Sequence, residues 1–98
     1  MADVYFGEFR LYVMEHRKAV EALVQESHTV PWFLLRYLKR IEKQANEPGG
    51  KTRMEGHMRG LIRFYVDNID EHSELGERCQ LIYAEYRRTL KMHQEKSE

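Results

Sequence analysis

The sequence predicts an all-α domain, a small bundle of three or four helices that we expect to form a dimer. Apolar residues recur at spacings of three and four along the chain, which is the period of a helix buried on one side. No stretch alternates apolar and polar residues between turn residues, as a half-buried strand would. The 98 residues, 42% of them apolar, suffice for one small core. We therefore expect one domain over residues 1–98, with helices at 3–27, 30–46, 52–70 and 73–94.

The first helix is predicted from an apolar stripe, on which His16 also lies. Asp3 is its expected N-cap, because a short polar side chain there can accept a hydrogen bond from an unpaired backbone N–H. The stripe consists of Phe6, Phe9, Val13, Val20 and Leu23.

The second helix should begin near Thr29 to Pro31, since proline is tolerated in a first helical turn, where its missing N–H has no partner to lose. Its apolar positions are Leu34, Leu38, Ile41 and Ala45. Further large side chains widen this stripe well beyond one face: Trp32, Phe33, Leu35 and Tyr37.

A flexible loop is expected at 47–51, where Pro48 disfavours a helix and two glycines follow. Thr52 and Glu55 have the spacing of a capping box, which predicts that the third helix starts at Thr52. We expect its buried side to hold Met58, Leu61, Ile62, Tyr65, Val66 and Ile69.

A break or kink is expected between residues 70 and 76, with Ser73 as the cap of a fourth helix. Residues 94–98 are polar and are expected to fray. The apolar positions of the fourth helix are Leu75, Cys79, Ile82, Tyr83, Tyr86 and Leu90.

Composition excludes some classes of protein. The longest apolar run, residues 30–35, is interrupted by proline and is far shorter than a membrane span, so no membrane partner is expected. The amino terminus lacks the basic and apolar regions of a secretory signal, and the lone Cys79 cannot form an internal disulfide. We therefore expect a cytoplasmic protein.

The zero net charge conceals two oppositely charged segments. Residues 36–63 carry eight basic and three acidic side chains, whereas residues 64–77 carry five acidic side chains and no basic one. Either these segments are solvated helix faces, or they are complementary patches that meet across a symmetric dimer or on a partner.

The sequence has more large apolar side chains than one small core can bury. This surplus favours a protein that acts by contact with a partner protein and forms a homodimer. We expect an inhibitor, antiactivator, adaptor or chaperone of unknown partner. Large aromatic residues would anchor the interface, with Arg36 and Arg40 at its rim. The predicted anchors are Phe6, Phe9, Tyr12, Val13, Trp32, Phe33 and Tyr37.

No catalytic constellation is evident, so we expect no enzyme, cofactor or metal site. The five histidines lack helical spacings to one another or to a glutamate that would make them converge on a metal. One alternative is nucleic-acid binding by cations on one side of the second helix: Arg36, Lys39, Arg40 and Lys43.

A second alternative comes from an arginine followed, after four to six residues, by a histidine. Arg10 with His16, and Arg87 or Arg88 with His93, have this spacing. It resembles the signature of the HEPN ribonucleases, and the resemblance implies an all-helical enzyme whose arginine and histidine lie near the scissile phosphate of RNA.

Overall fold

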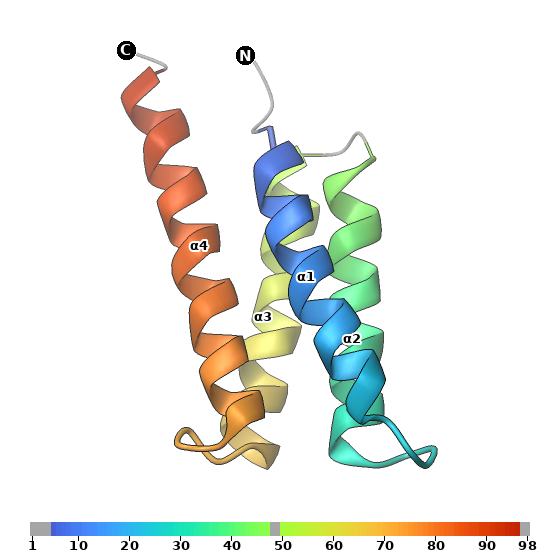
Figure 1. Ribbon diagram of the computed structural model, residues 1–98. Coiled ribbons are helices and arrows are strands. Elements are labelled where there is room, and N and C mark those ends of the chain that lie inside the picture. Colours follow the sequence, from blue (N-terminus) through green and yellow to red (C-terminus); the bar gives the residue numbers. More distant parts are fainter. Residues whose placement is uncertain (1–4, 48–49, 97–98) are drawn as a thin grey trace.

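The protein is an all-α bundle in the computed structural model, which describes residues 5–47 and 50–96 and confirms the predicted fold class. Within these ranges the helices are α1 (Gly7–Leu23), α2 (Val30–Ala45), α3 (Gly50–Asn68) and α4 (Glu74–Lys96). They run alternately up and down: α1 begins, α2 ends, α3 begins and α4 ends at the same end of the bundle (Figure 1). Helices α1 and α3 each pack against both α2 and α4, and so occupy opposite corners.

The core lies along the bundle axis and follows the predicted stripes closely. Each helix contributes one face, and aromatic rings concentrate where α1 meets α4, with Phe9 and Tyr86 5.9 Å apart between ring centroids. The fully buried side chains are Phe9, Val13, Val20, Leu34, Leu38, Ile41, Met54, Met58, Leu61, Cys79 and Ile82. Two stripe positions depart from the prediction, because Leu23 at the end of α1 and Val66 near the end of α3 are 40% and 69% exposed.

Helix α1 is shorter than predicted, since it begins at Gly7 and ends at Leu23. Asp3, the expected N-cap, lies outside the described residues. At the other end Val24 is extended, and residues 25–28 offer no apolar side chain that would hold a further turn against the core. The chain reverses there through His28, whose φ of 67° is in the left-handed region.

Helix α2 begins at Val30 with Pro31 in its first turn, as predicted. Helix α3, in contrast, begins at Gly50, so Thr52 lies inside it and is not its cap. The predicted loop is correspondingly shorter, and Pro48 and Gly49 lie outside the described residues.

The turn between α3 and α4 confirms the predicted break and its cap. The hydroxyl of Ser73 accepts a hydrogen bond from the backbone N–H of Gly76 at 3.1 Å and donates one to the carbonyl of Asp70 at 2.6 Å. The Asp70 side chain in turn accepts from the N–H of His72 at 2.9 Å. A Cβ at position 76 would lie 2.2 Å from the Asp70 carbonyl oxygen, so this turn requires glycine.

Two polar contacts tie the helices together at the edge of the core. The Arg17 guanidinium of α1 donates to both carboxylate oxygens of Glu42 of α2, at 2.8 and 3.3 Å, and this pair is largely shielded from solvent. His16 is buried and contacts Arg78 of α4. No helix in the described part of the chain has the length and apolar character to cross a membrane.

Candidate functional site

Five of the predicted partner-binding residues lie together on the outer side of α2. We call Trp32, Phe33, Arg36, Tyr37 and Arg40 the α2 surface. They follow one another at helical spacing, and with His28 they line a shallow depression of about 390 Å³. The spacing places them beside the stripe that faces the core, so α2 is apolar on more than one side.

Aromatic rings form a continuous chain across this surface. The Trp32 ring lies 4.9 Å from Phe33 at an interplanar angle of 84°, an edge-to-face arrangement that aromatic quadrupoles favour. Phe64 of α3 continues the chain, with its ring centroid 6.1 Å from that of Phe33 and 5.2 Å from that of Tyr37. His28 extends the chain of rings beyond the start of α2, with its ring centroid 4.5 Å from that of Trp32. The rings therefore hold one another in place.

The two arginines of the α2 surface lie over these rings. The Arg36 guanidinium carbon is 4.9 Å from the Trp32 ring centroid, and that of Arg40 is 5.7 Å from Tyr37. Both distances are within the range of a cation–π interaction. A guanidinium that lies over a ring in this way can still offer N–H donors to a binding partner.

Arg36 and Arg40 differ in their ion pairing from the two lysines near them on α2. Both lysines form ion pairs: the Lys39 Nζ atom lies 3.6 Å from Oε2 of Glu21, and the Lys43 Nζ atom lies 4.0 Å from Oε1 of Glu47. Among the described residues no carboxylate lies within 4.0 Å of Arg36 or Arg40. Their positive charges are therefore not neutralised by any carboxylate in the described part of the chain.

Gly60 of α3 makes room for this arrangement. A Cβ at position 60 would lie 3.2 Å from the Tyr37 ring, closer than ordinary van der Waals contact. Tyr37 thus rests on the backbone of α3 and bridges the two helices. At Gly56, one turn earlier on the same helix, nothing lies within 4 Å of an added Cβ.

The other predicted anchors lie on α1 or, for Phe6, at its N-cap, and most of them are not on the surface. Phe6, Phe9 and Val13 are 4%, 0% and 0% exposed, so they belong to the core and are not available as surface anchors. Tyr12 is half-buried, with its ring 4.9 Å from that of His16. These side chains are covered because α1 has neighbours on two sides, which its own periodicity did not reveal.

His28 and Phe64 were missed by the sequence analysis. Phe64 reaches the α2 surface from another helix, and His28 reaches it from a turn with positive φ. The spacing of four between His28 and Trp32 was the only local signal for either residue.

The arginine and histidine pairs whose spacing resembles the HEPN signature lie outside the α2 surface. His16 is buried against Arg78, whereas Arg10 lines a depression between the start of α1 and the end of α2. Arg88 and His93 do line one depression, of about 120 Å³, at the end of α4. There Arg88 is paired with Glu85, and His93 Nε2 lies 3.0 and 3.1 Å from the backbone N and O of Tyr5.

Cys79 is buried, and burial raises the pKa of its thiol to about 12, so it is protonated at neutral pH. In the described residues no three His, Cys, Asp or Glu side chains gather closely enough to hold a metal ion.

The fold and this surface describe a four-helix bundle with an exposed aromatic and cationic face. Comparison with known proteins finds no matching family model, no similar curated protein and no similar solved structure.

Proposed function

We propose that this protein regulates a partner protein by binding it through the α2 surface, as an inhibitor, antiactivator, adaptor or chaperone. The observation that carries the proposal is the packing of Arg36 and Arg40 over the rings of Trp32 and Tyr37, with no carboxylate partner for either arginine among residues 5–47 and 50–96. Tryptophan, tyrosine and arginine are the residue types that most often dominate binding energy at protein interfaces. Nothing in the proposal requires a reaction or a cofactor.

The chemistry of the surface indicates what the partner presents. Arg36 and Arg40 would donate to carboxylates, and such charge pairs set the orientation and the rate of association. The rings of Trp32, Phe33 and Phe64 would cover an apolar group between those carboxylates. We therefore expect the partner segment to be acidic and to carry at least one large apolar side chain.

We further propose that the protein acts in the cytoplasm as a homodimer. Support for a dimer is the separation of charge along the chain, because a two-fold axis could place the basic segment, residues 36–63, against the acidic segment, residues 64–77, of a second copy. Analytical ultracentrifugation at low and high salt tests this part, and a monomer at all concentrations would contradict it.

Single-stranded nucleic acid is the competing ligand, since stacked rings and cations also bind bases and phosphates. Two double variants with the same charge change separate the ligands. Arg36→Gln with Arg40→Gln removes the stacked guanidiniums, whereas Lys39→Gln with Lys43→Gln removes neighbouring lysines that stack on no ring.

The experiment is affinity capture from the native lysate, with mass spectrometry of bound protein and an assay for bound nucleic acid. We expect a stoichiometric protein that the lysine variant retains and that the arginine variant binds at least about tenfold more weakly. Capture of nucleic acid that weakens equally in both variants and falls steeply with salt would contradict the proposal.

A further inference from the structure

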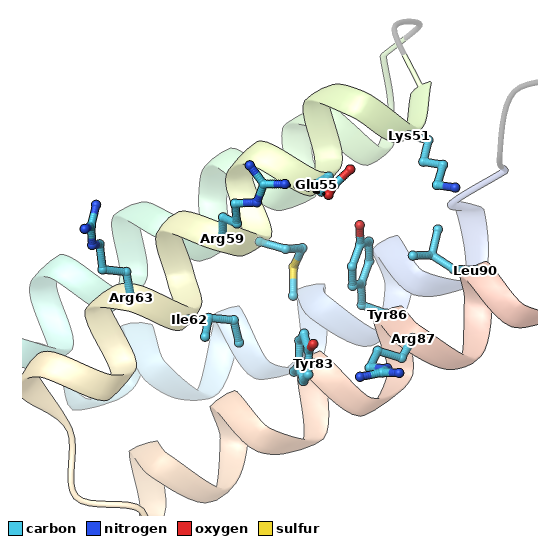
Figure 2. Close-up of a pocket in the computed structure, with 10 residues that line it drawn as sticks. Lys51, Glu55, Arg59, Ile62, Arg63, Tyr83, Tyr86, Arg87 and Leu90 are labelled. Atoms are coloured by element: carbon cyan, nitrogen blue, oxygen red, sulfur yellow. Dashed lines mark hydrogen bonds and ion pairs between the residues drawn. The ribbon is translucent and has the colours of Figure 1, made fainter.

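A groove with a volume of about 690 Å³ runs between α3 and α4 (Figure 2), and it shares no lining residue with the depression on α2. Its lining extends along α3 from Lys51 to Arg63, which are twelve positions apart and so separated by roughly 18 Å at the rise of an α-helix. This volume is in the range of small-molecule sites. The length favours an elongated ligand over a compact one.

The floor of the groove is apolar. Met58 and Tyr86 are 2% and 5% exposed, and the half-buried side chains of Ile62, Tyr83 and Leu90 form the rest of the floor. In Figure 2 the Tyr86 ring stands between the two helices with its hydroxyl directed toward α3. That hydroxyl has no hydrogen-bond partner among the described residues, so it can donate to a ligand. Burial, and next the charge of Glu55, raise the pKa of Tyr86, which keeps the hydroxyl protonated at neutral pH.

The rim of the groove is cationic. Lys51, Arg59, Arg63 and Arg87 line it against a single acid, Glu55, in a chain whose net charge is zero. Arg59 lies 2.9 Å from Glu55, and Arg87 lies over the Tyr83 ring at 5.8 Å.

Besides Arg87, which lies over the Tyr83 ring, two of these cations lack an ion pair among the described residues. In the part of the chain that the structure describes, Lys51 and Arg63 have no ion-pair partner. They lie at opposite ends of the groove, so an anionic group at either end of a bound molecule would meet one of them. A ligand that complements the whole lining needs an apolar body and a negative charge.

We propose that the α3–α4 groove binds an anionic amphiphile, a linear apolar chain that ends in a carboxylate or another acidic group. The apolar chain lies over Met58, Ile62 and Leu90, and the acidic group pairs with Lys51 or Arg63. This site is independent of the α2 surface and does not rest on the proposed partner protein.

Dodecanoate is the probe, and dodecan-1-ol, which has the same chain without the charge, is its control. We expect dodecanoate to bind the full chain saturably in a titration followed by ¹H–¹⁵N NMR, with shifts concentrated on the amides of α3 and α4 that line the groove. Dodecan-1-ol should bind at least about tenfold more weakly, because it cannot pair with the cations.

The matched variants are Lys51→Gln with Arg63→Gln in the groove and Lys39→Gln with Lys43→Gln on α2, which change the net charge equally. The groove variant should weaken dodecanoate binding about tenfold, and the α2 variant should leave it unchanged. All four replaced side chains are exposed, so neither variant should unfold the protein. The inference is overturned if dodecanoate does not bind saturably, if the alcohol binds as tightly, or if the two variants bind alike.

Discussion

The Nδ1 atom of His16 on α1 lies 3.1 Å from the Nη1 atom of Arg78 on α4. A guanidinium can only donate hydrogen bonds, so Nδ1 accepts, and the imidazole is neutral with its proton on Nε2. The contact joins two helices that are distant in sequence. It also disfavours the protonation of His16 in the folded protein.

This contact predicts that acid destabilises the protein through His16. Burial, and then the positive charge of Arg78, lower the pKa of His16 below its usual value of 6.5. Below pH 6.5 the unfolded chain therefore binds more protons at this position than the folded chain. The stability associated with His16 is complete above pH 6.5 and is lost as the pH falls through the lowered pKa of the folded state.

Urea unfolding between pH 7.5 and 5 measures this effect. The variant His16→Gln retains an acceptor for Arg78 and has no proton to gain, so its free energy of unfolding should fall less over this range than that of the wild type. His72→Gln, at an exposed histidine, is the control and should keep the wild-type slope. Identical slopes for His16→Gln and the wild type would show that His16 does not couple to folding.

Two glycines should respond oppositely to alanine. Gly76→Ala places a Cβ 2.2 Å from the Asp70 carbonyl oxygen, so the turn before α4 must shift, at a cost of about 2 kcal/mol in the free energy of unfolding. Gly56→Ala meets nothing within 4 Å and should stabilise α3 by about 0.5–1 kcal/mol, because alanine is the better helix former. Thermal or urea denaturation tests the pair. Equal effects at the two positions would mean that the turn does not have the geometry described.

Cys79 should be unreactive in the folded protein. The thiolate is the reactive form, and a buried thiol whose pKa is about 12 supplies almost none of it at neutral pH. A colorimetric disulfide reagent should label the native protein only as fast as the bundle opens, and should label it at once in denaturant. Rapid stoichiometric labelling without denaturant would contradict the burial of this residue.

Much of the fold could be predicted from the sequence because its signals are local. Pro31 in a first turn and Ser73 as a cap act within a few residues of their own positions, and both lie where they were expected. The predicted start of α3 at Thr52 was wrong. The spacing of Thr52 to Glu55 fits a capping box, but the helix begins two residues earlier, at Gly50.

The sequence predicted only those residues of the candidate site that lie on a single helix. Trp32, Arg36 and Tyr37 lie on one helix, so their spacing was enough to bring them together. Phe6 and Phe9 were misread as surface anchors because periodicity does not reveal how many neighbours cover a helix. Contacts between helices, such as the α3–α4 groove, required the three-dimensional arrangement.

The most direct test of the central claim is photocrosslinking in the native cell with benzoylphenylalanine at position 33. Phe33 is 37% exposed within the α2 surface, so a photoreactive group at this position can reach a bound partner. Benzoylphenylalanine also keeps the phenyl ring of the side chain that it replaces. Leu81, 51% exposed on α4, is the control position. We predict one discrete protein adduct from position 33 and none of that mass from position 81. Equal adducts from both positions, or none from position 33, would contradict the claim that the α2 surface binds a partner protein.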